Sequence, residues 1–375
     1  MKIYYEDSMP YATEFFAELG ECQVFSHKTI DADTLIDADV LLTRSTTKVN
    51  QALLEKNDRL QFVGTATAGT DHVDKAYLAS KGIPFTSAGG CNAVAVAEYV
   101  LSAIFVMAER LNWQVADKTV GIVGAGHVGT VLSNVLSVLG IQHKLCDPPL
   151  KDAGDPREMV TMDDIMSCDV ISLHVPFVAD GPYPTLDLFG AARLSQLSEK
   201  QLLINACRGE VINNKEALAL FKQGKKLNLV LDVWDKEPNI ETELVPYTAL
   251  ATAHIAGHTI EGKARGTEML YFALCKQLGV KPTKQLSDYL PIAANSQKSL
   301  PDTENFWDVI KYLVLDVYDI SVDDKHFKEK HDGAESFRYI RKHYPIRREF
   351  SAMTVNAGNS VHSKAIYGLG FLAPN

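Results

Sequence analysis

The chain has little cysteine, and none of it is arranged as a metal site or a disulfide framework. Its six cysteines are scattered over 375 residues and form no Cys-x-x-Cys pair. Zinc sites and disulfide frameworks both require recurring cysteine spacings. Scattered cysteines are typical of reduced thiols packed inside a cytoplasmic protein. We therefore predict no metal site and a cytoplasmic location.

Long apolar runs and an excess of basic residues are also missing. No stretch approaches the roughly 20 apolar residues that span a bilayer, and no basic region followed by an apolar stretch predicts a signal peptide at the N-terminus. The net charge of −10 argues against a broad surface for nucleic acid or anionic membrane. A small anionic substrate remains compatible with this charge, because one pocket can be locally basic. We predict no nucleic-acid and no membrane partner.

The chain is long, and predicted strands alternate with predicted helices along it. At 375 residues it exceeds one compact core, which predicts two or three domains. In the first ninety residues, β-rich runs alternate with helical patterns at 11–19 and 51–56, and this alternation predicts a parallel sheet. The predicted strands of this region are residues 3–5, 39–43 and 60–64.

A second strand–helix series follows a long apolar helix at residues 93–111, which we expect to lie between domains because it is too apolar for a surface. The predicted strands of this series are residues 118–123, 143–146, 170–173, 202–205, 229–233 and 249–253. Evenly spaced buried strands with helices between them predict a doubly wound nucleotide-binding sheet. Residues 281–283 are predicted to be a linker, and the remainder is richer in charge and aromatic residues.

The segment Gly124-Ala125-Gly126-His127-Val128-Gly129 is a G-x-G-x-x-G motif between a predicted strand and a predicted helix. Gly124 permits a tight turn, Gly126 permits close approach of a diphosphate, and Gly129 lets the helix pack on the sheet. The helix N-terminus would face the diphosphate with unpaired N–H groups. Asp147 ends the next strand, where a ribose-binding acid that repels a 2′-phosphate is expected. The motif therefore predicts NAD rather than NADP.

Three charged residues follow later strands, and together they suit the oxidation of a 2-hydroxy acid. Ligands of open α/β sheets bind at the carboxyl ends of the strands, so Arg208, Glu237 and His254 should converge there. His254 is the candidate general base and Glu237 the group that orients its imidazole. Arg208 is the candidate for holding the substrate carboxylate and polarising the C2 oxygen.

In this order, the segments resemble the D-isomer-specific 2-hydroxyacid dehydrogenase family. The resemblance covers roughly residues 36–280 and is carried by residues 43–45, 63–74, 88–92, 174–176, 180–185, 204–209, 254–257 and 261–267. It implies catalytic roles for Arg208 and Glu237, with His254 exchanging the proton. The cofactor-binding positions that the motif and the resemblance together imply are Gly124, Gly126, His127, Val128, Gly129, Asp147, Val175, Ala206, Cys207, Arg208, Asp232 and Gly257. Implied substrate contacts are Ser45 and Thr67, with His258 standing where the family has tyrosine.

The resemblance also implies an architecture and a reaction. It implies a flavodoxin-like lid domain at 1–92 with about 257–280, a Rossmann NAD-binding domain at 93–256, and a smaller α+β dimerisation domain at 285–375. The implied substrate is a phosphorylated hydroxy acid of pyridoxal 5′-phosphate (vitamin B6) biosynthesis, and the implied assembly is a homodimer. The last region is only loosely similar to the family, except for residues 347–350.

Two alternatives remain open for the function and one for the C-terminal region. The enzyme could act on another hydroxy acid, such as glycerate, lactate or phosphoglycerate, or the protein could be a non-catalytic NAD-sensing regulator. The apolar and aromatic residues of the C-terminal region have spacings that suit a buried helix face; they are Phe306, Trp307, Ile310, Tyr312, Leu313, Leu315 and Tyr318. That face could belong to a dimer contact or to an intramolecular cap.

Overall fold

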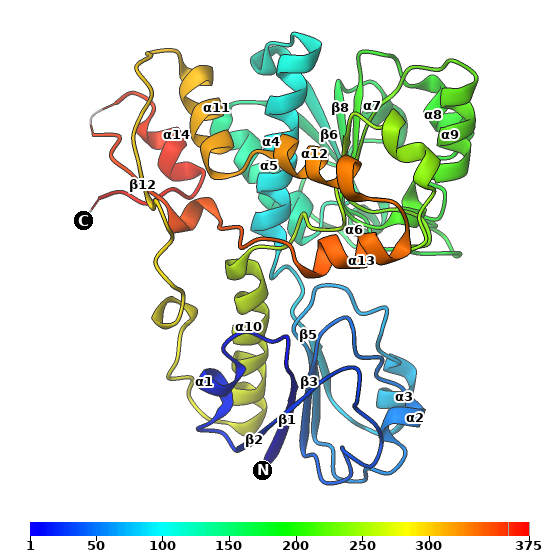
Figure 1. The fold of residues 1–375 in the computed structure, drawn as a ribbon, viewed down its shortest axis with the longest axis vertical. Helices are drawn as coiled ribbons and strands as arrows, with labels where there is room; N and C mark the ends of the chain where they lie inside the picture. Colours follow the sequence, from blue (N-terminus) through cyan, green and yellow to red (C-terminus); the bar gives the residue numbers. More distant parts are fainter. Residues whose placement is uncertain (359, 375) are drawn as a thin grey trace. The chain divides into compact units, whose positions relative to one another are not determined.

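The computed structural model describes residues 1–358 and 360–374, which form two compact units. Unit 1 comprises Met1–Asn92 and Thr259–Pro291, and unit 2 comprises Ala93–His258 and the described residues from Ile292 onward. Each unit is built on a parallel sheet with helices on both faces (Figure 1). The predicted fold class, two doubly wound sheets with an added C-terminal region, is confirmed.

Unit 1 has the flavodoxin-like strand order. Its elements are β1 (Lys2–Glu6), α1 (Ala12–Phe16), β2 (Glu21–Phe25), β3 (Val40–Thr43), α2 (Gln51–Leu54), β4 (Phe62–Thr65), α3 (Lys75–Ser80), β5 (Phe85–Ser87), α10 (Ile260–Leu278) and the 3₁₀ helix η4 (Leu286–Asp288). The five strands pair in parallel in the order β2-β1-β3-β4-β5. Strands β2 and β5 were not predicted, because β2 carries polar residues between its apolar ones and β5 has only three residues.

The core of unit 1 follows from the alternation of side chains along its strands. Leu42 and Phe62 face α1 and α10, whereas Leu41 and Val63 face α2 and α3. Helix α10 comes from the chain after the second sheet, so one face of unit 1 is covered by residues distant in sequence.

Unit 2 contains the second sheet and the C-terminal region. Its elements up to the last strand of the sheet are α4 (Ala93–Leu111), η1 (Val115–Asp117), β6 (Thr119–Val123), α5 (His127–Leu139), β7 (Gln142–Cys146), α6 (Pro148–Asp152), α7 (Met162–Met166), β8 (Val170–Leu173), α8 (Ala191–Gln196), β9 (Leu202–Asn205), η2 (Gly209–Val211), α9 (Asn214–Lys222), β10 (Asn228–Leu231), η3 (Thr242–Tyr247) and β11 (Leu250–Ala251). The last two strands are shorter than predicted.

The sheet of unit 2 has the Rossmann order. Six parallel strands lie in the order β11-β10-β9-β8-β6-β7, and an isolated parallel bridge between Leu145 and Met159 adds a rudimentary strand beyond β7. The strand order therefore reverses between β6 and β8. Ligands of open α/β sheets bind at the carboxyl ends of strands beside such a reversal.

Helix α4, which we expected to lie between domains because of its apolar sequence, belongs to unit 2 and packs there against both the second sheet's helix α5 and the C-terminal region. It is buried along most of its length and packs against α5 and against two C-terminal helices, α11 (Phe306–Val317) and α12 (Ile320–Lys330). Its apolar surface is therefore covered within unit 2, by one helix of the second sheet and by helices that follow that sheet in sequence.

The C-terminal region is a small α+β arrangement. It consists of β12 (Gln297–Lys298), α11 (Phe306–Val317), α12 (Ile320–Lys330), α13 (Ala334–Lys342), η5 (Phe350–Ala352), β13 (Thr354–Val355) and α14 (Ser363–Gly368). Ile310 and Leu313 are buried in a core shared with α4, whereas Tyr312 is 44% exposed. The predicted apolar helix face thus packs largely within the same chain.

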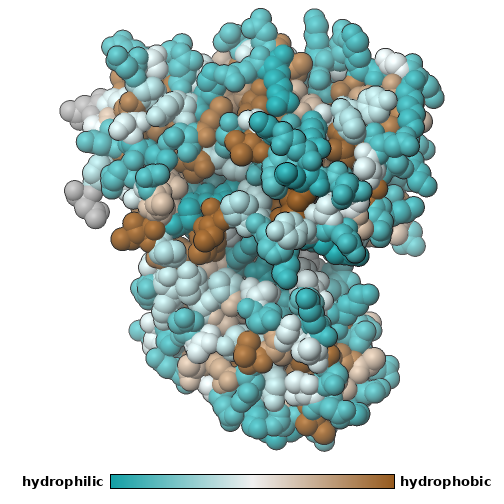
Figure 2. All heavy atoms as spheres, viewed as in Figure 1, coloured by the Kyte–Doolittle hydropathy of each residue, from teal (hydrophilic) through white to brown (hydrophobic). Residues whose placement is uncertain are grey.

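Among the described residues, no helix is both long and apolar enough to cross a membrane. On the face shown in Figure 2, hydrophobic residues are interspersed among hydrophilic ones.

Candidate active site

The glycine motif forms the turn between β6 and α5. Each of its three glycines meets a different structural requirement. Gly124 has φ +92°, and a Cβ there would lie 2.5 Å from the His174 carbonyl oxygen. A Cβ on Gly129 would collide with the carbonyl of Gly124, so helix α5 could not approach the strand. Gly126 is the N-cap of α5 with no side-chain cap, and a Cβ there would meet nothing within 4 Å. The turn therefore leaves open space beside the start of the helix.

The start of α5 offers donors to that space. His127 and Val128 occupy its first turn, where main-chain N–H groups have no partner within the helix. His127 is exposed and Val128 is half-buried. A diphosphate matches these donors in charge and hydrogen bonding, so the residues present fit a dinucleotide.

Asp147 sits beside the glycine turn and holds it. One of its carboxylate oxygens accepts from the Ala125 N–H at 2.8 Å, and the other caps α6 by accepting from Leu150 N–H at 3.1 Å. Asp147 therefore stabilises the glycine turn and the first turn of α6, as expected for a polar residue directly before Pro148. Its contact with a ribose stays a prediction.

Arg157 also supports the glycine turn, and the sequence motifs did not reveal it. Its guanidinium donates to the Ala125 carbonyl at 2.9 Å and to the Thr130 hydroxyl at 2.8 Å. Asp155 orients the guanidinium through two further hydrogen bonds of 2.8 Å. Arg157 comes from the loop after α6, and no spacing rule connects that loop to the motif.

The structure brings Glu237 and His254 together. Nδ1 of His254 lies 2.7 Å from one Glu237 oxygen, and the other oxygen accepts from the Trp234 N–H at 2.9 Å. Burial by itself raises the pKa of Glu237, but the charge and hydrogen bond of His254 and the Trp234 N–H outweigh it, so that pKa lies below its ordinary value. The His254 side chain is 32% exposed, and Nε2 has no hydrogen bond to the described residues. Nε2 is the atom available for proton exchange.

Arg208 lies in the turn after β9, which packs on the loop carrying Glu237. A Cβ on Gly209 would collide with the main chain of Trp234, so only glycine permits this approach. Arg208 donates to the Cys207 carbonyl at 2.7 Å. Burial raises the pKa of the Cys207 thiol to about 11, which keeps it protonated and unreactive.

The remaining predicted cofactor positions of unit 2 also follow strands of its sheet. Val175, Ala206 and Gly257 are half-buried in the loops after β8, β9 and β11. Asp232 is 1% exposed, and its carboxylate accepts from the Ile255 N–H at 2.7 Å and from the Thr252 hydroxyl at 2.7 Å. Its observed role is to hold the His254 loop, while its predicted contact with NAD stays a prediction.

His258 ends the same loop and lies beside the C-terminal region. Its ring centroid is 6.2 Å from that of Tyr344 in an edge-to-face arrangement. His258, the predicted substrate contact, lies four residues after His254. It contacts Tyr344, which comes shortly before residues 347–350, the part of the C-terminal region that resembles the family.

Ser45 and Thr67 lie in unit 1, where each follows a strand. Ser45 is exposed in the loop after β3. The Thr67 hydroxyl lies 2.9 Å from that of Thr65 and donates to the Gly69 carbonyl at 3.0 Å. His72 completes this group through a 2.9 Å contact with Thr65. Both predicted substrate contacts are thus built into loops at the carboxyl edge of the unit 1 sheet.

Glu6 organises the loop that carries Ser45. It is fully buried and accepts from the hydroxyls of Thr46 at 2.5 Å and Thr47 at 2.6 Å, and from the Arg44 N–H at 2.9 Å. Burial raises the pKa of Glu6, but these hydrogen bonds and one from Ser8 outweigh burial, so that pKa is lowered.

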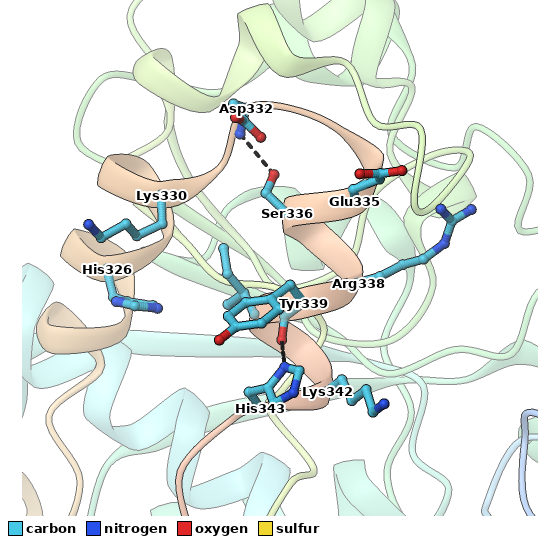
Figure 3. Close-up of a pocket in the computed structure, with 10 residues that line it drawn as sticks. His326, Lys330, Asp332, Glu335, Ser336, Arg338, Tyr339, Lys342 and His343 are labelled. Atoms are coloured by element: carbon cyan, nitrogen blue, oxygen red, sulfur yellow. Dashed lines mark hydrogen bonds between the residues drawn. The ribbon is translucent and has the colours of Figure 1, made fainter.

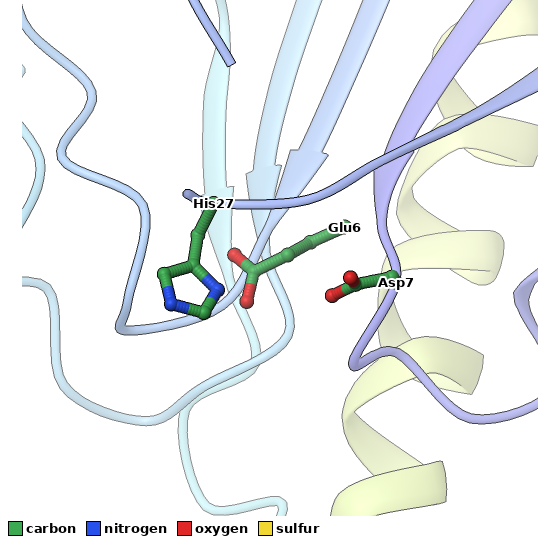
Figure 4. Close-up of side chains that lie close together, drawn as sticks. All are labelled: Glu6, Asp7 and His27. Carbon is green, nitrogen blue, oxygen red and sulfur yellow. The ribbon is translucent and has the colours of Figure 1, made fainter. Parts of the chain in front are cut away.

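Glu6 also belongs to a group of three side chains with metal-ligating atoms. Asp7 and His27 lie beside it, with candidate ligand atoms within 4.8 Å of one another (Figure 4). Asp7 and His27 are both exposed, and the Glu6 oxygens already accept hydrogen bonds. We therefore assign Glu6 to the support of the Ser45 loop.

A separate hollow of about 810 Å³ lies between α12 and α13. Figure 3 shows His326, Tyr339 and His343 around it. Nδ1 of His343 forms a hydrogen bond of 2.9 Å with the Tyr339 carbonyl oxygen. None of the site residues predicted from the sequence lines this hollow.

Comparison with known proteins identifies the family. The profile described as "D-isomer specific 2-hydroxyacid dehydrogenase, NAD binding domain" matches residues 96–256, and a domain of unknown function matches residues 289–370. The chain is 62% identical over 371 residues to a protein of Pseudoalteromonas atlantica, covering 99% of both chains. It is 49% identical to a protein of Colwellia psychrerythraea, again with 99% of both chains covered. Both relatives are named erythronate-4-phosphate dehydrogenase.

Solved structures resemble the fold at lower identity. The NAD⁺-bound 3-phosphoglycerate dehydrogenase of Entamoeba histolytica has a TM-score of 0.63 and 21% identity, with 74% of this chain and 95% of that chain covered. D-Lactate dehydrogenase of Aquifex aeolicus, solved with NAD and lactic acid, has a TM-score of 0.56 and 22% identity, with the same coverage. The strand order, the glycine turn and the extent of these similarities agree: the chain belongs to the D-isomer specific 2-hydroxyacid dehydrogenase family, among the members named erythronate-4-phosphate dehydrogenase.

Proposed function

We propose that this protein oxidises 4-phospho-D-erythronate to 2-oxo-3-hydroxy-4-phosphobutanoate with NAD, as a step of pyridoxal 5′-phosphate biosynthesis. The observation that carries the reaction type is the Glu237–His254 pair, 2.7 Å apart, in loops at the sheet edge that also bears Arg208 and the glycine turn. The substrate is supported by relatives that are 44–62% identical over nearly the full chain and share one name.

The glycine turn and α5 would hold the cofactor. The open space beside Gly126 admits the diphosphate, and the uncapped start of α5 supplies N–H donors to it. Asp147 lies next to this turn, where its carboxylate would accept from ribose hydroxyls and repel a 2′-phosphate. NAD, when bound, supplies the acceptor for the hydride that leaves C2 of the substrate.

His254 and Glu237 perform the proton transfer. Nδ1 of His254 is engaged by the Glu237 carboxylate, so Nε2 receives the proton of the C2 hydroxyl. The hydroxyl oxygen becomes the carbonyl oxygen as the C2 hydride departs, and the imidazolium that forms is stabilised by Glu237. The proton then passes to solvent through the exposed edge of the ring.

Arg208 and three further residues would position the substrate. The planar guanidinium of Arg208 suits a carboxylate next to the reacting carbon and stabilises charge on the C2 oxygen. Ser45 and Thr67 remain the predicted substrate contacts of unit 1. His258 replaces the family's tyrosine, and its imidazole can still donate a hydrogen bond.

An assay across substrates tests the proposal. NADH formation is measured with 4-phosphoerythronate, glycerate, lactate and 3-phosphoglycerate. We expect kcat/KM for 4-phosphoerythronate to exceed the others by at least about 10²-fold, because an unmatched phosphate or missing hydroxyl leaves polar groups unpaired. A preference for another acid would replace the proposed substrate, and turnover of none would favour the NAD-sensing regulator.

We also propose that the protein is a homodimer and works in the cytoplasm. All six cysteines are free thiols, which fits a reducing compartment. The C-terminal region exposes Ile346 by 79% and Val361 by 89%, apolar surface that a second copy could cover. Because α11 and α12 cover α4, deleting the region would expose the core of unit 2, so the test is the mass of the intact chain by light scattering. A mass near 41 kDa would overturn the dimer.

A further inference from the structure

The loop at residues 254–258 needs support, because its first residue has an unfavourable backbone. His254 has φ +57°, in the left-handed region that non-glycine residues rarely adopt and that persists only where surrounding contacts hold it. Asp232 supplies one side of this support. Its carbonyl accepts from the His254 N–H at 2.7 Å, and its carboxylate accepts from the Ala256 N–H at 3.0 Å.

The other side of the support comes from Arg347, nearly a hundred residues later in the chain. Its guanidinium donates to the Ala256 carbonyl at 3.1 Å and to the Ala95 carbonyl at 2.6 Å, at the start of α4. The guanidinium also lies over the Tyr318 ring at 3.8 Å. Arg347 is only 6% exposed, so its contacts are not in competition with bulk water. One side chain thus ties the catalytic loop to α4 and to the C-terminal helices.

Acidic and phenolic side chains surround the guanidinium. Burial alone would lower the pKa of Arg347, but Tyr318, Tyr344, Glu98 and Asp323 outweigh it and raise that pKa. Asp323 accepts hydrogen bonds from both Tyr318 at 2.9 Å and Tyr344 at 2.7 Å, which fixes the aromatic side chains around Arg347.

The main chain that follows Arg347 is anchored to the same helix. The Glu98 carboxylate of α4 accepts from the Phe350 N–H at 2.8 Å. Both ends of the segment 347–350 are therefore attached to α4, and the arginine reaches from this fixed segment to the catalytic loop. A side chain on a fixed base can hold its target more accurately than one on a mobile loop.

We propose that Arg347 is a positioning residue for the proton transfer: it holds the Ala256 carbonyl and thereby keeps the His254 imidazole in line with Glu237. The proposal rests on the proposed function, in which His254 exchanges the proton. Without the guanidinium, the buried Ala256 carbonyl loses its donor and the loop turns to find another. The C-terminal region is then part of the catalytic apparatus of its own subunit and not only a surface for assembly.

The first experiment compares Arg347→Met with Arg347→Lys and with Arg338→Met, a control at an exposed arginine of α13. Arg347→Met should lower kcat for 4-phosphoerythronate by about 10²-fold, the effect of a displacement of about 1 Å at a reacting group. Arg347→Lys retains a charged donor and should recover about tenfold of that loss. NAD affinity should stay within about threefold, because the glycine turn is untouched. Equal kcat in Arg347→Met and Arg338→Met would overturn the proposal.

The second experiment asks whether Arg347 acts through His254. In a His254→Ala background, Arg347→Met should lower kcat by less than about twofold, because residues that act as a unit are not additive. A further loss of about 10²-fold would show an independent, purely structural effect and overturn the proposal. If Arg347→Met does not fold, Arg347→Lys carries the same comparison, with circular dichroism as the check on folding.

A third measurement does not depend on the substrate. Diethyl pyrocarbonate acylates free imidazole nitrogens, and mass spectrometry of peptides reports the rate at each histidine. Arg347→Met should change the rate of acylation of His254 at least threefold, because loss of the Glu237 contact frees Nδ1 and alters the nucleophilicity of Nε2, while exposed His326 reacts as before. An unchanged rate at His254 would overturn the positioning role. If the wild-type chain oxidised no hydroxy acid, the proposed function would fail, and this measurement would still test Arg347.

Discussion

The two sheets of this protein are wound alike but differ in the turn after their first strand. In unit 2 that turn is glycine-rich and leads into a 13-residue helix whose N-cap has no side-chain partner. In unit 1 the turn begins at Glu6, a buried carboxylate, and leads into a helix of five residues. The turn of unit 2 offers main-chain N–H donors to an anion, whereas the turn of unit 1 contains a carboxylate that accepts from Ser8 and from the loop after β3.

This difference teaches that winding alone does not create a nucleotide site. Both sheets gather loops at the carboxyl ends of their strands, yet the turn of unit 2 is made of glycines with open space beside Gly126, whereas the turn of unit 1 begins at a buried carboxylate. In unit 1 the same edge is used to fix a loop, because the Glu6 carboxylate binds the residues on both sides of Ser45.

The largest expected effect comes from comparing two histidines, one at the carboxyl ends of the strands in each sheet. His254→Ala should lower turnover by about 10² to 10⁴, the usual contribution of general acid–base catalysis, while NAD binding stays nearly intact. His72→Gln in unit 1 should lower turnover by less than about tenfold, because His72 contacts Thr65 and, among the described residues, no carboxylate is hydrogen-bonded to its ring. Steady-state kinetics with 4-phosphoerythronate decide this. A His254→Ala enzyme with most of the wild-type rate would remove His254 from the mechanism.

Substitutions at two glycines of the unit 2 turn distinguish an effect on packing from an effect on cofactor binding. Gly129→Ala should weaken NAD binding by at least about 10²-fold and lower the melting temperature, because its Cβ would collide with the Gly124 carbonyl. Gly126→Ala should fold normally, since its Cβ meets no protein atom, and lose about tenfold in NAD affinity by filling the space for the diphosphate. Calorimetric titration and thermal melts measure both. Wild-type affinity in Gly126→Ala would mean that the cofactor does not approach this residue.

Glu6→Gln tests the anionic turn of unit 1. The amide cannot accept from all of the donors around it, so stability should fall by about 1–3 kcal/mol, whereas Asp7→Asn at the exposed neighbour should change it little. Urea melts at neutral pH measure the difference.

The pH dependence of the Glu6→Gln loss has a fixed sign. The pKa of Glu6 is lower in the folded chain than in the unfolded chain, so its carboxylate stabilises the fold above the unfolded value of about 4.3. That contribution is lost as the pH falls through the folded value. The difference between wild type and Glu6→Gln should therefore shrink below about pH 4, and a difference that grew with acid would contradict the assignment.

The smallest effect concerns cofactor choice at the unit 2 turn. Asp147→Ala should reduce the preference for NAD over NADP by about tenfold, because it removes both the ribose acceptor and the repulsion of a 2′-phosphate. Asp147→Asn removes the charge and keeps one acceptor for capping α6, but its amide nitrogen cannot accept from the Ala125 N–H, so its melting temperature is compared with that of Asp147→Ala. The ratio of kcat/KM for the two cofactors is the measurement. An unchanged ratio in both variants would leave Asp147 as a turn residue alone.

The sequence predicted the parts of the fold and site that depend on local pattern. The strands β8 and β9 and the helix at residues 93–111 were found at their observed bounds, because continuous apolar runs mark buried elements. The polar edge strand β2 was missed because most of its residues are exposed or half-buried, and its strand conformation depends on pairing with β1.

By itself the sequence determined the two parallel sheets, the glycine turn and the residue types that carry the chemistry, because these follow from short-range periodicity and spacing. Only the tertiary structure decided which side chains support them. Arg347, Arg157 and Glu6 act on loops that lie 91, 32 and about 40 residues away in the chain. A hydrogen bond across such a separation depends on how whole elements pack, and packing is a property of the assembled core that no local pattern encodes.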